Sequence, residues 1–245
     1  MIEKKLYYVW IGSKSKPEIF FKCYDSWKKN LPEYDIIEIN ENNFNIEKYT
    51  KENRFFRECY ERKLWAYLSD YMRIVHLYEN GGIYLDIDME IIKNIDAFLG
   101  NSFFIGYEDE KNVSVGIFGT EKRHEFLKKV IEFYDNEIWE KPLWTIPKIF
   151  TYILEKDFGL KNSQDKNYLS KEDIKIYPRE YFYPYHFTEE YTESCITENT
   201  YGIHWWNDSW NSMKVSIFME TKHLHGIKKG VKLIKIFLRY TLKKR

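Results

Sequence analysis

Two neighbouring stretches decide the fold: Ser69-Asp70-Tyr71-Met72-Arg73, followed by Gly81-Gly82-Ile83-Tyr84-Leu85-Asp86-Ile87-Asp88-Met89. The first stretch lies in a predicted helix, because apolar residues recur at helical spacing at Leu64, Leu68, Tyr71, Met72, Val75 and Tyr78. Asp70 and Arg73 lie off this apolar stripe and are three residues apart, so their side chains share one face of the helix. Asn80-Gly81-Gly82 ends the helix, because these residues tolerate the left-handed conformation of a last turn. A strand is expected to follow.

The second stretch predicts a strand over 83–89 in which successive side chains alternate between two sides. Tyr84, Asp86 and Asp88 then fall on the same side of that strand. Two unpaired carboxylates at this distance would repel each other, so the pattern indicates a cation or a set of hydroxyl donors between them. A solvated strand face gives the same pattern, since a short Asp-x-Asp motif is not specific by itself. The upstream Asp and Arg and the two glycines favour a site.

Together, Ser69-Asp70-x-x-Arg73 and Gly81-Gly82-x-Tyr84-x-Asp86-x-Asp88 resemble the signature of glycosyltransferases with a DXD-containing sugar-binding region. These are the family 32 enzymes, related to the initiating mannosyltransferase and to capsular polysaccharide enzymes, and distantly to clostridial glucosylating toxins. The resemblance extends from Leu6 to about Tyr134, with a further piece near His204. It implies a GT-A-type nucleotide-sugar-binding fold of the α/β class, with a mixed, mostly parallel central sheet flanked by helices.

The resemblance also implies a divalent metal site. Asp88 is the first expected ligand, His204 completes the metal shell, and Asp86 holds the ribose or a metal-bound water. Two carboxylates and an imidazole, with no thiolate nearby, suit Mn²⁺ or Mg²⁺ better than zinc. A lone histidine is more often structural, so His204 depends on the resemblance, and Asp208 is the next candidate ligand.

Further residues are implied to bind a sugar nucleotide. Trp10 matches a tryptophan that stacks on the nucleotide base, although core packing accounts for Trp10 equally well on the residues alone. Asp70 and Arg73 are expected to bind hydroxyls of the transferred sugar, the Asp as acceptor and the Arg as donor. Ser209 and Trp210 match an element near the end of the catalytic domain of family members and are expected to hold phosphate oxygens.

The order of the predicted elements favours an α/β fold. A strand over 6–12, a helix opened by Pro17 and a strand over 34–40 form a right-handed βαβ unit, which indicates a parallel sheet. Ligands bind such sheets at the carboxyl ends of the strands, so Trp10 and the two aspartates are expected on one edge. The later elements are a helix at 55–62, a short antiparallel segment at 90–93, strands at 103–107 and 113–118, and helices at 124–136 and 146–156.

The turn over 108–110 is acidic. We expect it to be solvated, with a wall of the acceptor site as the second interpretation.

The composition excludes several classes of protein. With 38 basic and 38 acidic residues the chain has no net charge, so we expect no nucleic-acid partner. Three widely spaced cysteines fit neither a disulfide framework nor a clustered zinc site and indicate a reducing compartment. The sequence shows no apolar signal segment and no run of about 18 apolar residues, so it predicts neither secretion by that route nor a membrane span.

The tail over 227–245 has eight basic residues and no acidic one. On a helical wheel one basic stripe is formed by Lys228, Lys232, Lys235, Arg239 and Lys243. Most of the remaining surface is covered by Val231, Leu233, Ile234, Phe237, Leu238, Tyr240 and Leu242. This pattern is typical of a helix in an anionic membrane interface, although a terminal helix docked on the domain gives the same pattern. We therefore divide the chain into a catalytic domain (1–226) and a basic amphipathic helix (227–245).

The resulting hypothesis is a metal-dependent, retaining glycosyltransferase that moves a hexose from a nucleotide sugar to a glycan or lipid-linked saccharide. Asp70, Arg73 and Asp88 are its expected catalytic residues, and family frequency favours a UDP-hexose over GDP-mannose. It would act in the synthesis of surface polysaccharide such as capsule or lipopolysaccharide, in the cytoplasm and peripherally on the inner face of the cell membrane.

Two alternatives remain open. A haloacid-dehalogenase-like phosphatase also carries Asp-x-Asp at the end of a strand, but it prefers Thr or Val where this chain has Glu90. A non-catalytic sugar-binding module would bind sugars without turnover.

Overall fold

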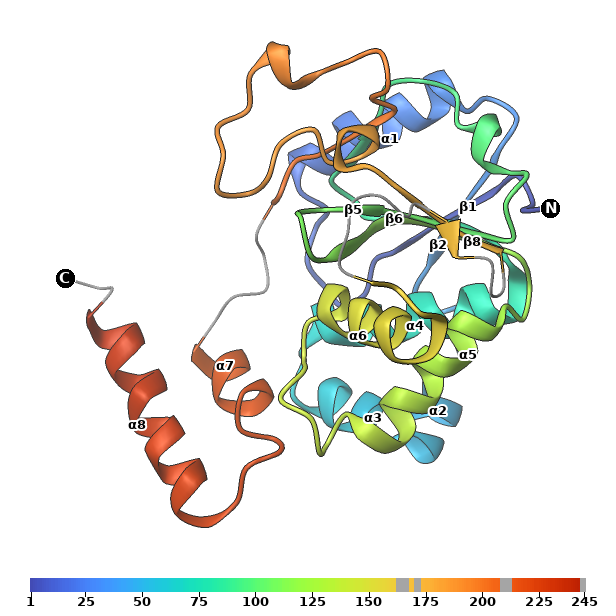
Figure 1. Cartoon of the computed structure of the whole chain (residues 1–245). Coiled ribbons are helices and arrows are strands. Elements are labelled where there is room, and N and C mark those ends of the chain that lie inside the picture. Colours follow the sequence, from blue (N-terminus) through green and yellow to red (C-terminus); the bar gives the residue numbers. More distant parts are fainter. Residues whose placement is uncertain (162–167, 170–172, 208–212, 243–245) are drawn as a thin grey trace.

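The computed structural model describes residues 1–161, 168–169, 173–207 and 213–242 and has an α/β architecture (Figure 1). The strands of the main sheet are β1 (Lys5–Val9), β2 (Asp35–Ile39), β3 (Gly82–Leu85), β5 (Phe103–Tyr107), β6 (Val113–Thr120), β7 (Tyr168–Leu169) and β8 (Ile174–Tyr177). Within the described residues these seven strands are ordered β2-β1-β3-β6-β5-β8-β7. The sheet lies in the middle of the molecule, with helices above and below it.

Most strands of this sheet point the same way. β1 is parallel to β2 and β3, and β5 is parallel to β8. β6 and β7 run antiparallel to their neighbours, so five of the seven described strands share one direction. The expected fold class, a mixed, mostly parallel sheet flanked by helices, is confirmed.

The N-terminal part of the chain forms the predicted βαβ unit. α1 (Glu18–Asn30) connects β1 to β2 and covers one face of the sheet (Figure 1). Pro17 lies at the N-cap of α1, where its missing N–H costs no helical hydrogen bond. The indole N–H of Trp27, which is fully buried, donates to the carbonyl of Met89 at 2.7 Å. This bond ties α1 to the segment that follows β3.

The other face of the sheet is covered by a layer of helices (Figure 1). They are α2 (Ile46–Glu52), α3 (Arg54–Glu61), α4 (Trp65–Asn80), α5 (Glu125–Glu132) and α6 (Ile146–Phe158), and a π-helical turn, η2 (Phe133–Glu137), continues α5. The helices predicted near 55–62, 124–136 and 146–156 are therefore confirmed, as are the strands predicted near 103–107 and 113–118.

The helix α4 is buried on most of its sides rather than along one stripe. It packs against β1 and β3 and also against α3 and α5, so it lies inside the helical layer. Asp70 and Arg73 are therefore only 8% and 6% exposed. Their predicted position off the core was wrong, because the polar face of α4 packs on the sheet, where Arg73 contacts Asp86 and the carbonyl of Val115 on β6. The predicted end of this helix is confirmed, since Gly81 follows it with a φ of 67°.

The stretch that carries Asp86 and Asp88 is not one continuous strand. β3 ends at Leu85, and the chain turns so that the N–H of Met89 donates to the carbonyl of Asp86 at 3.0 Å. A second strand, β4 (Met89–Ile91), then leaves the main sheet and pairs antiparallel with β9 (Gly202–His204). The predicted strand over 83–89 is thus wrong in its second half, while the predicted short antiparallel segment after it is found as β4.

Two C-terminal helices, α7 (Met213–Met219) and α8 (Gly226–Leu242), stand apart from the sheet on the side away from the N-terminus (Figure 1). Glu220 joins them, since its carboxylate lies 2.7 Å from Lys232 and 2.6 Å from Arg239 of α8. Among the described residues, no helix has the length and apolar character needed to cross a membrane. The remaining short helical turns are η1 (Asp96–Phe98), η4 (Arg179–Tyr181) and η5 (Glu193–Cys195).

Candidate metal and donor site

Two neighbouring parallel strands end at the candidate site. β1 ends at Val9 and is followed by Trp10, and β3 ends at Leu85 and is followed by Asp86. Because the strands are parallel, both segments leave the sheet at the same edge, as predicted. The N–H of Asp86 donates to the carbonyl of Gly116 on β6 at 2.8 Å, which fixes the start of the turn.

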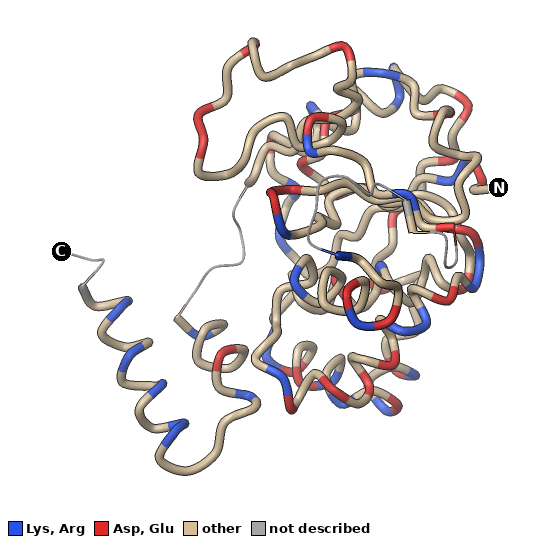
Figure 2. The backbone as a smooth tube through the Cα atoms, in the orientation of Figure 1, with Lys and Arg blue, Asp and Glu red and all other residues tan. Residues whose placement is uncertain are grey.

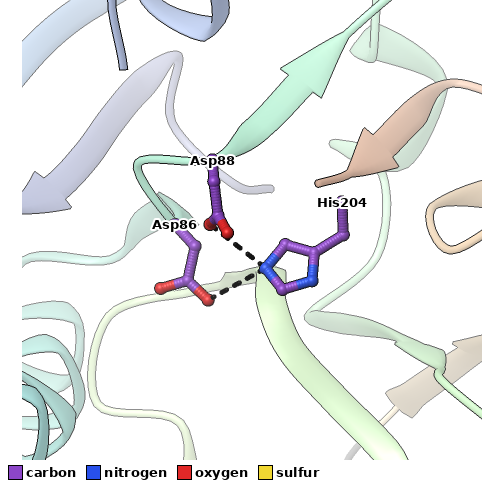
Figure 3. Close-up of side chains that lie close together, drawn as sticks. All are labelled: Asp86, Asp88 and His204. Carbon is purple, nitrogen blue, oxygen red and sulfur yellow. Dashed lines mark ion pairs between the residues drawn. The ribbon is translucent and has the colours of Figure 1, made fainter. Parts of the chain in front are cut away.

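Three side chains converge beyond this edge: Asp86, Asp88 and His204 (Figure 3). Each offers one ligand atom, and these atoms lie within 4.8 Å of one another. Nε2 of His204 lies 3.2 Å from Oδ1 of Asp88 and 3.7 Å from Oδ2 of Asp86. The three residues that were expected to form the metal site are therefore brought together by the fold.

The small sheet brings the histidine to the carboxylates. His204 on β9 lies directly opposite Met89 on β4. The next residues then hold Asp88 from the backbone: Trp205 donates its N–H to the Asp88 carbonyl at 3.0 Å, and Asn207 donates its N–H to the carboxylate at 2.8 Å. The position of His204 therefore depends on the register of two short strands.

The donor atoms fit a divalent cation. Nε2 of His204 is buried and faces the carboxylate oxygens of Asp88 and Asp86, so a cation placed between them would meet three ligand atoms. In the described part of the chain the cluster consists of two carboxylates and one imidazole. Carboxylate oxygens and an imidazole nitrogen are both ligands that divalent cations accept in proteins.

The charges of Asp88 and His204 stabilise each other. Burial alone would raise the pKa of Asp88, but the charge and hydrogen bond of His204 and the N–H of Asn207 hold this pKa below its usual range. Burial alone would lower the pKa of His204, yet the carboxylates of Asp88 and Asp86 hold it above its ordinary value. A divalent cation would compete with the proton on His204, so its binding would release a proton.

Arg73 connects α4 to the same carboxylates. Its Nη2 lies 3.1 Å from Oδ1 of Asp70, and its Nη1 lies 3.0 Å from Oδ1 of Asp86. The guanidinium lies 4.2 Å from the centre of the Tyr84 ring, whose hydroxyl donates to Asp86 at 2.9 Å. The prediction that Asp70 and Arg73 share a face of the helix is confirmed, and the guanidinium also reaches the turn after β3.

Asp70 is buried beside this guanidinium. Burial raises the pKa of Asp70 to about 7, the charge of Arg73 opposes this rise, and the charge of Asp86 adds to it. One positive charge therefore serves two carboxylates, of which Asp70 is buried and Asp86 is half-buried. Asp70 is a hydrogen-bonding group that can exchange a proton near neutral pH.

The remaining expected donor residues are placed only in part. Trp10 is partly buried at the carboxyl end of β1, and its indole N–H donates to the carbonyl of Lys14 at 3.1 Å. Ser209 and Trp210, together with the reserve ligand Asp208, lie outside the described residues.

Two further residues lie near the site. Glu108 was expected in a solvated turn, with a wall of the acceptor site as the second interpretation, and it is half-buried. Burial raises the pKa of Glu108 to about 7, against the opposing hydrogen bond of Ser114 and the charge of His204. The ring centre of Tyr183 lies 5.8 Å from that of His204, and its hydroxyl accepts the N–H of Ile117 at 3.0 Å. Glu108 could have been placed near the site from the sequence, because it directly follows an apolar strand. Tyr183 could not, because it belongs to a segment without periodicity.

Two families match successive parts of the chain. The family described as "Glycosyltransferase sugar-binding region containing DXD motif" matches residues 17–105, which include α4 and the turn after β3. The family described as "Alpha 1,4-glycosyltransferase conserved region" matches residues 119–225, which include His204. The three converging side chains are therefore contributed by two successive matched regions.

Curated relatives are similar at low identity. Lactosylceramide 4-alpha-galactosyltransferase of Pan troglodytes is 26% identical over 161 residues, which are 60% of this chain and 43% of that enzyme. Alpha-1,4-N-acetylglucosaminyltransferase of Homo sapiens is 28% identical over 156 residues, 61% of this chain and 44% of that enzyme. The chain thus spans less than half the length of these two relatives. An uncharacterized glycosyltransferase of Acanthamoeba polyphaga mimivirus is 26% identical over 237 residues, 91% of this chain and 90% of its own.

One solved structure supports the fold. The PaToxG glycosyltransferase superposes with a TM-score of 0.53 over 64% of this chain and 69% of its own, at 18% sequence identity. At this identity the likeness concerns the fold alone. The expected GT-A-type fold is confirmed.

Proposed function

We propose that this chain transfers a hexose from a nucleotide sugar to a glycan or lipid-linked saccharide, because it belongs to the glycosyltransferases with a DXD-containing sugar-binding region. The names of two relatives specify galactose and N-acetylglucosamine. Both sugars are activated as UDP derivatives, which favours a UDP-hexose over GDP-mannose as the donor.

One observation carries this proposal: Asp86, Asp88 and His204 converge at the strand edge next to Arg73. Asp88 and His204 would hold Mn²⁺ or Mg²⁺, and Asp86 would hold the ribose or a metal-bound water. When bound there, the ion offsets the negative charge that develops on the leaving diphosphate.

The donor's other parts have candidate partners at the same edge. Trp10 would stack on the base, since it directly follows β1, whose neighbour β3 leads into Asp86. Ser209 and Trp210 would hold phosphate oxygens, as the family resemblance implies.

Asp70 and Arg73 are proposed to bind the transferred sugar. Arg73 is held in place by two carboxylates and the Tyr84 ring, so a hydroxyl near it meets a donor that needs little reordering. Asp70, whose pKa burial raises to about 7, can accept a hydroxyl hydrogen bond in its ionised form. The pair would thus orient the sugar at the anomeric carbon.

The proposed reaction retains the anomeric configuration. The two relatives form alpha linkages by name, and the common UDP-hexoses are themselves alpha-linked. Attack would occur on the face from which the diphosphate leaves, within an ion-pair-like transition state. Proton NMR of the first product distinguishes retention from inversion by the coupling constant at the new anomeric centre.

Peripheral membrane binding is proposed for α8. This helix carries basic positions and no acidic one (Figure 2). Five of its apolar side chains are exposed: Ile227, Val231, Ile234, Phe237 and Leu238. Ile236, on the opposite side of the helix, is 1% exposed, and the Tyr240 hydroxyl on that side lies 2.9 Å from the Ser216 hydroxyl of α7. An anionic bilayer would accept both features, which fits a lipid-linked acceptor in capsule or lipopolysaccharide synthesis on the inner face of the cell membrane.

The enzyme proposal is tested by nucleotide release. The chain is incubated with a panel of UDP- and GDP-sugars, with Mn²⁺ and with a chelator, and each donor is paired with simple saccharide acceptors. Release that requires metal and is lost in Asp88→Asn, but kept in the exposed control Asp25→Asn, supports transfer. Hydrolysis of a generic phosphoester without donor turnover would favour the phosphatase alternative. Donor binding without turnover in the presence of acceptor saccharides would favour a sugar-binding module.

A further inference from the structure

A second candidate site is a cleft of about 250 Å³ between α3, α7 and the start of α8. None of the three converging residues of the metal site lines this cleft. Its ionisable side chains are five basic ones and one acidic one: Arg54, Arg62, Lys222, His225, Lys229 and Glu58. The cleft therefore has an excess of positive charge in a chain without net charge.

Part of this positive charge is already used within the protein. The carboxylate of Glu58 lies 2.6 Å from the guanidinium of Arg62, so each of these charges has an opposite partner. The ammonium group of Lys222 donates to three backbone carbonyls between 138 and 143 and fastens the α7 side of the cleft. Two cationic side chains remain that have no acidic partner in the described part of the chain, Arg54 and Lys229, and the imidazole of His225 also lines the cleft.

Aromatic rings form one wall of the cleft and hold its arginines in place. The guanidinium of Arg54 lies 4.1 Å from the centre of a Trp139 ring, and that of Arg62 lies 4.6 Å from the Phe218 ring. Both guanidinium groups therefore stack on aromatic rings at the cleft.

The geometry points to a binding site for a phosphomonoester, either a lipid headgroup or free phosphate. Arginine and lysine side chains, with a single acidic group that is already paired, suit a ligand that only accepts hydrogen bonds and carries two negative charges. The volume is many times the roughly 10–15 Å³ that a single water needs. Lys229 belongs to the first turns of α8, so the cleft involves the same helix that carries exposed apolar residues on its other side.

The site is tested first with inorganic phosphate. The full chain is titrated at constant ionic strength with a chelator present, and binding is followed by ³¹P line broadening and by the thermal midpoint. Arg54→Gln and Lys229→Gln are expected to weaken binding about fivefold each, as for one cation near an anionic group. Lys235→Gln, which removes the same charge from α8 outside the cleft, is expected to bind as the native chain does. The side chains of Arg54 and Lys229 are exposed, so both cleft variants are expected to fold.

The second arm separates the two sources of phosphate. Vesicles of phosphatidylcholine contain either phosphatidic acid or phosphatidylglycerol at equal surface charge. A preference for phosphatidic acid that Arg54→Gln and Lys229→Gln abolish, and Lys235→Gln keeps, assigns the cleft to a lipid headgroup. Phosphate binding without this preference assigns it to a soluble anion. If the native chain and both cleft variants bind phosphate equally well and also bind the two kinds of vesicle equally well, the proposal is overturned.

Discussion

The buried guanidinium of Arg73 and the half-buried carboxylate of Asp86 form an ion pair, with 3.0 Å between Nη1 and Oδ1, although one lies in the middle of α4 and the other in the turn after β3. The same guanidinium lies 3.1 Å from Asp70. The residues proposed to bind the sugar and those proposed to bind the metal therefore share one cation. A change at either group alters the electrostatic potential at the other.

Arg73→Gln is expected to lower both turnover and stability. It leaves Asp70 buried without a cation, and removing one partner of a buried ion pair costs about 3–5 kcal/mol. Urea unfolding and donor turnover measure the two effects.

Two further variants give this prediction its control. Arg73→Lys keeps the charge but cannot contact both carboxylates with a planar fork, so it should recover stability in part and turnover very little. Arg179→Gln breaks an exposed pair with Glu189 and should cost at most about 1 kcal/mol. An equal loss of stability in Arg179→Gln and Arg73→Gln would contradict the argument.

Asp88→Ala is expected to abolish transfer, and His204→Ala to raise the Mn²⁺ concentration needed for half-maximal activity or to abolish activity. Both side chains offer ligand atoms to the same cluster, so the loss of either one removes a metal ligand and lowers the affinity for Mn²⁺. Activity is measured against Mn²⁺ concentration, with circular dichroism as the check on folding. A His204→Ala enzyme with normal metal dependence would remove this residue from the metal site and leave Asp208 as the next candidate.

The stability of the protein is expected to respond to Asp70 as the pH changes. Burial raises its pKa to about 7 from 3.8, so between these values the folded state binds more protons than the unfolded state. The stability that Asp70 contributes is thus present at about pH 4 and is lost as the pH rises toward 7. Relative to Asp70→Asn, the native chain should lose on the order of 1–4 kcal/mol over this range. Urea unfolding in chelator at several pH values tests this, and a difference that stays constant with pH would refute it.

Ile234→Ser and Phe237→Ser should weaken binding to anionic vesicles. These side chains are 63% and 59% exposed, and burial of each in lipid is worth about 1.5–3 kcal/mol. Phe21→Ser removes a comparably exposed ring from α1 and serves as the control. Vesicle flotation at low salt gives the readout. If both α8 variants float as well as the native chain, the helix does not enter lipid through this side.

Removal of the residues after Gly226 should also release the chain from these vesicles, with turnover of a soluble acceptor analogue nearly unchanged. This deletion is a harsher test than the point variants, because Glu220 loses both of its cationic partners. Stability should be measured alongside it. A truncated chain that misfolds, or that floats as before, would assign α8 to the core of the protein.

Local patterns predicted the local features of the fold. The spacing of apolar residues located α4, and Asn80-Gly81-Gly82 located its end, because helix formation and termination depend on neighbours in sequence. Alternation failed over 83–89, since the chain makes a tight turn at Asp86 that the same residue types would also allow in a strand. Helical spacing could not show that Asp70 and Arg73 are buried, because it does not say which other elements pack on the polar face of α4.

The complete site could not be predicted from periodicity. His204 reaches Asp88 only through the pairing of β4 with β9, two short strands far apart in the sequence, and only the family resemblance named it. Tyr183 likewise comes from a segment whose order depends on tertiary contacts. Residues that come together through long-range pairing leave no local signal to read.

The turn between β3 and β4 is the point at which the chain passes from the large sheet to the small one, and Asp86 and Asp88 lie within it. His204 sits on β9, which pairs with β4 in the described part of the chain. An ion held by all three would act as a reversible cross-link between the N-terminal half and the segment that leads to α7. Chelation should therefore open this cross-link, and limited proteolysis should then cut first beyond Thr200.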